Sequence, residues 1–191
     1  MAPHTLRISR SRHAVVGHVI GRCISEVSIV AGSARGYRGY CIFNAYAENV
    51  QGRPQWREGS KNPECTTIMY GGIISMAILC EQRGWKYEHW LGCDKADFDM
   101  IYLRSFERFG KDEDQARAMQ HACRERAREI LIQYWKAVEA LAAALLVQGI
   151  VSGREAHRII QQAIDASVTD WRMERWNTIS SFLALDDEHL A

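Results

Sequence analysis

Hydrophobic and polar positions follow two different periods along this chain, and together they predict an α+β fold. Over 25–30 and 40–46, side chains alternate with the two-residue period of a half-buried strand. From Glu64 onward, apolar residues recur with the three-to-four-residue spacing of amphipathic helices. We therefore predict a predominantly α-helical α+β protein, with a small N-terminal β-sheet followed by a helical bundle.

Glycines and capping residues mark where these helices begin and end. Gly21 and Gly149 are suitable terminators, Asp94 is a candidate N-cap, and Ser152 with Glu155 has the spacing of a capping box. The predicted helices cover residues 10–21, 64–83, 94–109, 111–148 and 152–164, with a short amphipathic helix near the C-terminus and a polar loop over 49–63.

The length of 191 residues is typical of one domain, and no linker divides the chain. We expect a single domain over 1–191. Residues 1–9 lie in an arginine- and serine-rich start without an acid, which indicates a disordered or non-ancestral tail. Residues 169–191 are expected to form a C-terminal appendage.

Composition narrows the possible partners and the compartment. A net charge of +1 gives no global attraction to nucleic acid or to an anionic membrane. The longest apolar stretch, Val138–Val151, is too short for a membrane span and is interrupted by Glu139 and Gln148. Six cysteines without a C-x-x-C pair are typical of free thiols in a reducing compartment, so we expect a cytoplasmic protein.

Residues 13–21 read His-Ala-Val-Val-Gly-His-Val-Ile-Gly and resemble the second half of a zinc-binding helix. In a His-Glu-x-x-His helix, two histidines one turn apart bind zinc and the glutamate activates water. If His13 is the second histidine, Ser9 occupies the position of the first and Arg10 that of the glutamate. Serine is a poor zinc ligand, and arginine keeps its proton and cannot act as a general base.

Three stretches, taken in order, resemble the peptidase domain of the FtsH-type ATP-dependent zinc metalloproteases. Residues 13–21 with 27–30 resemble the zinc helix and first strand of that family. Residues 92–98 resemble the segment that delivers an aspartate ligand, and residues 127–160 resemble the closing helix pair. No G-x-x-x-x-G-K-[ST] loop occurs in the chain, so the ATPase module of the family has no counterpart here.

The resemblance implies a metal site and a polypeptide substrate. His13 and Asp97 fall on two of the three metal-ligand positions, whereas Ser9 occupies the third. Zinc is the family's cofactor, and we expect weak or absent zinc binding here, with no intact catalytic residue. The Gly-x-Ala-Ala-Glu pattern of the family's middle helix ends at Met76, which we interpret as apolar repacking. Without the resemblance, the favoured interpretation of Asp97 is an acid that stabilises the N-terminus of a helix, and not a metal ligand.

Other histidines are weaker candidates for the missing ligand. His18 lies about 140° from His13 around a helix and faces elsewhere. His4 and His89 would have to fold back or approach from a loop, and a surface or hydrogen-bonded role is favoured for each.

Two functions from different classes remain open. The first is an FtsH-like zinc metallopeptidase domain that has lost activity. The second is a non-catalytic peptide-binding module or helical scaffold, with an extended peptide pairing at an exposed edge of strand 40–46. A homo-oligomer is possible in either case. Trp85, Tyr87 and Trp90 either line such a groove or, as we favour, anchor a long loop.

The departure from the family pattern begins abruptly before His13. One hypothesis is a pseudo-peptidase; the other is that residues 1–12 replace an ancestral segment ending in His-Glu-x-x through a shifted start or reading frame. Reading the upstream DNA in all three frames distinguishes the two.

Overall fold

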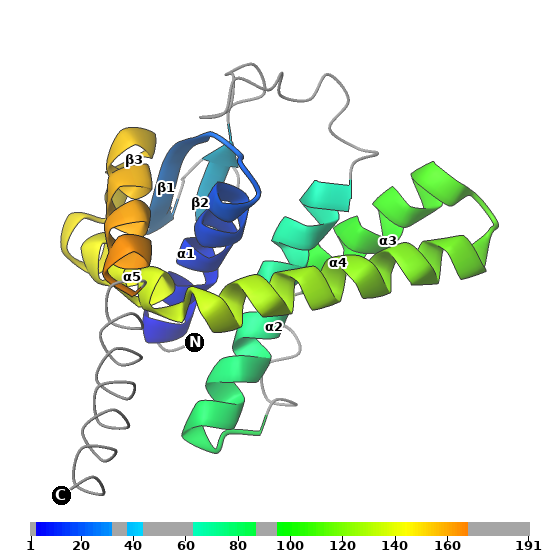
Figure 1. Cartoon of the computed structure of the whole chain (residues 1–191), viewed down its shortest axis with the longest axis horizontal. Helices are drawn as coiled ribbons and strands as arrows, with labels where there is room; N and C mark the ends of the chain where they lie inside the picture. Colours follow the sequence, from blue (N-terminus) through cyan, green and yellow to red (C-terminus); the bar gives the residue numbers. More distant parts are fainter. Residues whose placement is uncertain (1–2, 32–37, 44–62, 87–94, 168–191) are drawn as a thin grey trace, which may run out of the picture.

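The computed structural model describes residues 3–31, 38–43, 63–86 and 95–167, and confirms a mostly helical α+β fold with a small N-terminal sheet (Figure 1). In chain order its elements are α1 (Pro3–Val19), β1 (Ile24–Ala31), β2 (Arg38–Phe43), α2 (Pro63–Arg83), α3 (Lys95–Phe109), α4 (Glu113–Gln133), α5 (Trp135–Gln148) and β3 (Ile150–Ser152). Residues 153–167 are helical.

The sheet is antiparallel, with β1 between β2 and β3. Val27 of β1 is opposite both Cys41 of β2 and Val151 of β3, and Val27 and Val151 are fully buried. The sequence pattern did not predict β3, because three residues between Gly149 and a capping box are too few to show an alternation. This short strand joins the C-terminal half of the chain to the N-terminal sheet.

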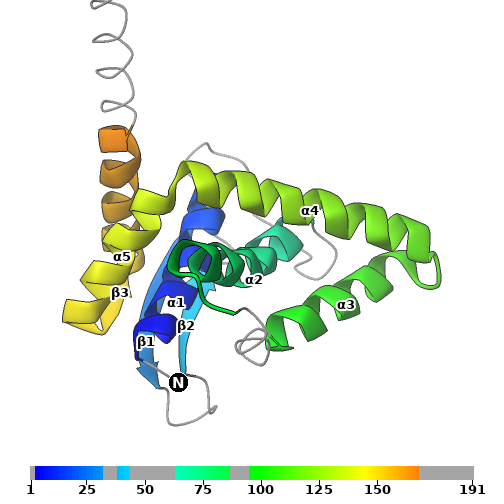
Figure 2. The ribbon, with the colours of Figure 1, turned by 90° about the horizontal axis from the view of Figure 1, so that it is seen from below.

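The first helix lies at the centre of the fold and contacts β1, β2, α2 and α5 (Figure 2). Its Ala14, Val15 and Val16 have no exposed surface. The helix begins at Pro3, well before the expected start near residue 10. Residues 3–9 are therefore helical and not disordered, while a non-ancestral origin for them stays a prediction. Proline is tolerated in the first turn of a helix, and no breaker follows it before Gly17.

The predicted helix over 111–148 is two helices, because α4 and α5 meet at Tyr134 with a bend of 75°. Tyr134 has φ −117° and ψ 29°, outside the helical range, while its N–H still bonds to the carbonyl of Ile130. The bend directs α5 onto α1, where Leu141 and Leu145 are fully buried. No glycine or proline marks this break, so the helical period alone could not reveal it.

Helix α2 is long and apolar enough to cross a membrane by length and composition, as is the bent α4–α5 pair taken as one span. The apolar pattern of the sequence had indicated only Val138–Val151. However, 67% of the apolar window in α2 is buried inside the protein. A core helix of a globular protein passes the same test, and α2 packs against α1, α3 and α4.

Several predictions fall outside the described residues. They are the turn after β1, the end of the second strand, the loop over 49–62, the N-cap Asp94, the aromatic connection beyond Lys86 with Tyr87, His89 and Trp90, and the appendage over 169–191.

Candidate functional site

The fold brings together His13 and Asp97, the two residues that the sequence assigned to metal-ligand positions. Nε2 of His13 in α1 lies 3.4 Å from Oδ2 of Asp97, in the first turn of α3. The His13 side chain is 8% exposed and that of Asp97 is 23% exposed. Residues far apart in the chain therefore form a largely buried polar pair.

Gly72 of α2 permits this approach. A Cβ atom at position 72 would lie 2.6 Å from Oδ2 of Asp97 and 3.0 Å from Nε2 of His13. Carbon and oxygen atoms do not approach to 2.6 Å without displacement, so any side chain here would push the pair apart. The glycine pair in the middle of α2, unfavourable for a helix by itself, thus has a packing reason.

The charge environment of the pair favours an ionised Asp97. Burial raises the pKa of the Asp97 carboxyl, but the hydrogen bond and charge of His13, with the charges of Arg10 and Arg12, outweigh burial and hold that pKa below its usual value. Asp97 is therefore a carboxylate at neutral pH, and its negative charge faces a guanidinium at the position where the family has a glutamate.

Arg12, one residue before His13, is fully buried beneath the site. Its Nη1 donates to the carbonyl of Gly72 at 2.8 Å and to Oγ of Ser75, and its Nη2 donates to the sulfur of Met76 at 3.4 Å. The guanidinium therefore ties α1 to the middle of α2. Burying an arginine is costly unless its N–H groups are bonded, and α2 supplies acceptors for both terminal nitrogens, Nη1 and Nη2.

The sequence pattern did not reveal the buried role of Arg12, and it revealed only part of the role of its partner Met76. Met76 is 2% exposed and packs with Leu79 and Cys80, which agrees with apolar repacking. Its sulfur, however, also accepts a hydrogen bond from Arg12. The sequence offers little signal for this role, because Arg12 stands beside other polar residues, Arg10, Ser11 and His13, on α1.

A cleft of about 270 Å³ opens beside the pair. Its walls come from α1, β2, α2 and α3, and combine two arginines with apolar side chains: Arg10, His13, Cys41, Phe43, Cys65, Ile68, Met69, Asp97 and Arg104. Arg10 thus lies in the wall that holds His13 and Asp97. Since β2 is at one edge of the described sheet and contributes Cys41 and Phe43, a strand edge borders the cleft.

The described donor set does not fit a zinc ion. Three histidine, cysteine or acidic side chains placed to share one metal are not found in the described part of the chain. His13 and Asp97 supply two donors, and the third family position, Ser9, lies on α1 one turn earlier with its side chain outside the description. Arg10 adds a positive charge that would repel a cation.

Of the three alternative histidines, His18 alone has a described side chain, and it does not supply a third ligand. His18 points away from His13 and bonds with His157, as expected from its angular position on the helix. The side chain of His4 and the whole of His89 lie outside the described residues.

Trp85 is 42% exposed at the end of α2, with the guanidinium of Arg83 5.3 Å from its ring centre. It lies outside the wall of the cleft described above. Of the three aromatic residues in this connection, it alone falls within the described residues.

No protein-family model matches this chain, and no curated protein is significantly similar to it.

Proposed function

We propose that this chain is an FtsH-like peptidase domain that does not hydrolyse peptide bonds and that binds extended polypeptide in the cleft beside His13 and Asp97. The observation that carries the proposal is the 3.4 Å approach of these two residues, which fall on two metal-ligand positions of the family that the sequence resembles. Asp97 also lies in the first turn of its helix, as expected for the aspartate ligand of the family.

The loss of hydrolysis follows from the chemistry of the residues present. Arg10 occupies the general-base position, lines the cleft, and cannot accept a proton from water at neutral pH. Ser9 provides at best a weak ligand in place of an imidazole. The remaining His13–Asp97 pair consists of an imidazole and a carboxylate that contact each other, and it provides no metal-activated water to attack a peptide bond.

Peptide binding is supported by the composition of the cleft and by its border. Phe43, Ile68 and Met69 give it apolar surface for side chains, while Arg10 and Arg104 provide positive charge. Strand β2 lies at an edge of the described sheet, and an extended peptide can add to such an edge through backbone hydrogen bonds. A polypeptide with an acidic or carboxyl-terminal group suits this charge.

The second candidate is a helical scaffold that binds no peptide. It is favoured by α3, which exposes Phe98, Tyr102 and Phe106 along one side. Binding of unfolded casein separates the two candidates: a peptide-binding cleft should bind casein and lose it when the cleft is blocked by Met69→Arg, whereas a scaffold acting through α3 should show no binding that depends on the cleft.

The register of the site is tested by restoring the missing residues. The double variant Ser9→His with Arg10→Glu recreates His-Glu-x-x-His on α1, and we expect it to bind zinc in a one-to-one ratio while the parent chain binds much less. Metal analysis of the folded, dialysed proteins measures the difference, and cleavage of casein that a chelator abolishes would show that the site also hydrolyses peptides.

The matched control adds Asp97→Asn to the double variant. If the register is right, loss of this ligand should reduce zinc occupancy at least tenfold. A folded double variant without zinc would contradict the alignment, and stoichiometric zinc with casein cleavage in the parent chain would contradict the loss of function.

A further inference from the structure

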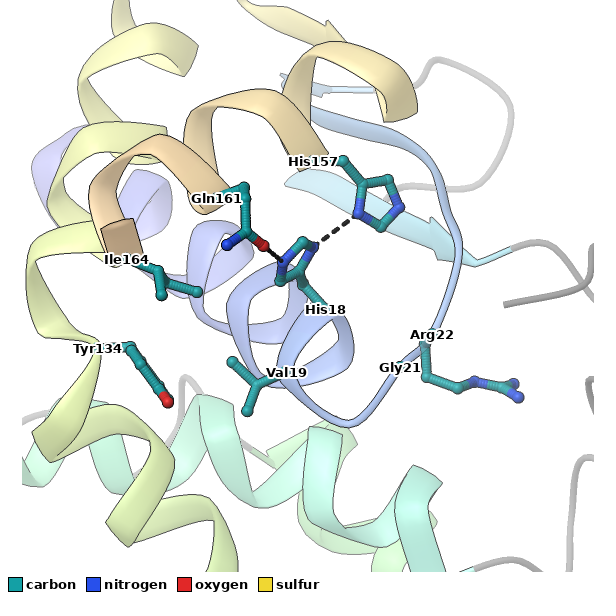
Figure 3. A pocket seen from close by; sticks show the side chains of 8 residues that line it. All are labelled: His18, Val19, Gly21, Arg22, Tyr134, His157, Gln161 and Ile164. Carbon is teal, nitrogen blue, oxygen red and sulfur yellow. Dashed lines mark hydrogen bonds between the residues drawn. The ribbon is translucent and has the colours of Figure 1, made fainter. Parts of the chain in front are cut away.

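A chain of side-chain hydrogen bonds fastens helix 153–167 to the end of α1 (Figure 3). Nδ1 of His18 lies 2.7 Å from Nδ1 of His157, and Nε2 of His18 lies 3.2 Å from Oε1 of Gln161. On its other side, His157 receives the backbone N–H of Ile24 at Nε2, over 3.0 Å. These hydrogen bonds thus join α1, the start of β1 and the helix after β3.

At each end of this hydrogen-bond network, the partner group determines whether the imidazole nitrogen carries a proton. The backbone N–H of Ile24 can only donate, so Nε2 of His157 has no proton. The amide nitrogen of Gln161 donates to Oδ1 of Asp165 at 2.9 Å, which turns the Gln161 oxygen toward His18. Nε2 of His18 must therefore carry a proton.

The two fixed ends determine the proton between the rings. A neutral His157 without a proton on Nε2 carries it on Nδ1, and a neutral His18 with a proton on Nε2 has a bare Nδ1. His157 accordingly donates to His18 across the 2.7 Å contact. Each donor faces one acceptor, so the network is complete only when both imidazoles are neutral.

Any added proton breaks one of these bonds. Protonating Nδ1 of His18 places two N–H groups against each other, unless His157 moves its proton to Nε2, where it would oppose the N–H of Ile24. A bridging metal at the two Nδ1 atoms meets the same obstacle, because the bond from Ile24 requires the proton on Nδ1 of His157.

Burial, more than the neighbouring charges, favours the neutral form of both imidazoles. Arg22 lines the same cavity with Tyr134, and no carboxylate lines it among the described residues. The helix dipole weakly disfavours a positive charge on His157, which lies in the second turn of its helix. A positive charge on His18 is favoured by its position in the last turn of α1 and by the carboxylate of Asp165, which is bonded to Gln161. Burial lowers the pKa of His18, against the hydrogen bond to Gln161, and burial with the charge of His18 lowers that of His157.

We propose that His18 and His157 form a proton-operated latch that holds helix 153–167 against α1 at neutral pH and weakens on acidification. Because the folded state binds protons less readily than the unfolded state, the latch is complete above the unfolded histidine pKa near 6.5. It weakens as the pH falls from there toward the lowered folded values. The latch is separate from the cleft and does not depend on the proposed function.

The proton positions are tested directly on the full chain by NMR of the histidine side chains, using long-range ¹H–¹⁵N correlations. At pH 7.5 we expect His18 to carry its proton on Nε2 and His157 on Nδ1, which is the less common tautomer in free histidine. Titration from pH 8 to 5 should give both residues a pKa below 6.5. The opposite tautomers, or a pKa at or above 6.5 for both, would overturn the proposal.

The mechanical consequence is tested by hydrogen exchange of the Ile24 amide and of the amides in 153–167. Their protection should fall by up to about tenfold per pH unit for each of the two histidines below pH 6.5, after correction for intrinsic exchange, until the folded pKa values are reached. The variant His18→Gln removes one titrating ring, and its pH dependence should be clearly shallower. The control His121→Gln changes an exposed histidine of α4 and should follow the parent chain.

Equal pH dependence in His18→Gln and in the parent chain would contradict the latch. If that variant does not fold, the tautomers and pKa values of the parent chain decide the question without it.

Discussion

Gly72 is the residue on which the meeting of α1, α2 and α3 depends. Its missing side chain leaves room for Asp97 and His13 on one side of α2, while its carbonyl accepts a hydrogen bond from Arg12. One residue thus bears on both the candidate site and the buried arginine below it. Gly72 leaves this room because it has no Cβ atom, which every other amino acid has.

Gly72→Ala should destabilise the protein by about 1–3 kcal/mol, although alanine is the better helix former, because the new methyl group overlaps the Asp97 carboxylate. Urea unfolding measures the change. The cost should fall by at least half when the substitution is made in an Asp97→Ala background, where the nearest overlapping atom is gone. A stabilising effect in the parent chain would contradict the close approach.

The junction between β3 and the helix after it links the two ends of the described chain. Gly153 follows β3 directly, and a Cβ atom there would lie 1.9 Å from the backbone oxygen of Ile24. Ser152 caps the helix as expected, since the N–H of Glu155 bonds to its Oγ at 3.4 Å, but the Glu155 carboxylate accepts hydrogen bonds from Arg158. The capping sequence thus starts the helix, and the glycine lets it start against β1.

We expect Gly153→Ala to cost about 2–3 kcal/mol of unfolding free energy, because a backbone oxygen cannot turn away as a side chain can. The adjacent, exposed Arg154 provides the control: Arg154→Ala should change stability by no more than about 0.5 kcal/mol. Thermal and urea unfolding of both variants would make the comparison, and equal stabilities would argue against the contact with β1.

At the scale of the whole molecule, the fold changes the acidity and reactivity of the cysteine thiols, which composition alone does not determine. The five described cysteines are free thiols, in line with the expectation from the lack of C-x-x-C pairs. Burial raises the pKa of the Cys41 thiol to about 12, despite the charge of Arg10, and also raises those of Cys65 and Cys123. Thiols in the candidate cleft are therefore poor nucleophiles.

At pH 8, alkylation of Cys41 by iodoacetamide should be at least about 100-fold slower in the native protein than in urea, because the raised pKa leaves little thiolate to react. Mass spectrometry of timed digests resolves each cysteine. Since a higher pKa favours the thiol form, raising the pH toward 10 should accelerate the native reaction. Equal native and unfolded rates at pH 8 would show that Cys41 is not held in this environment.

Periodicity and capping residues in the sequence were enough to predict the mostly helical α+β class, strand β1, helices α2 and α3, and the stop at Gly149, where φ is +73°. These features depend on interactions between residues close in the chain, so local sequence carries the signal. The ligand-position pair His13 and Asp97 came from family resemblance, and the fold places the two residues together.

Only the tertiary structure decided the remaining features. The bend at Tyr134, the strand β3, the burial of Arg12 and the His18–His157 contact each depend on segments that are distant in the chain. Arg12 and His18 look like ordinary polar positions in a helical pattern, because a residue's period shows which face it occupies and not which partner that face meets. Long-range packing selects those partners, and no local pattern encodes them.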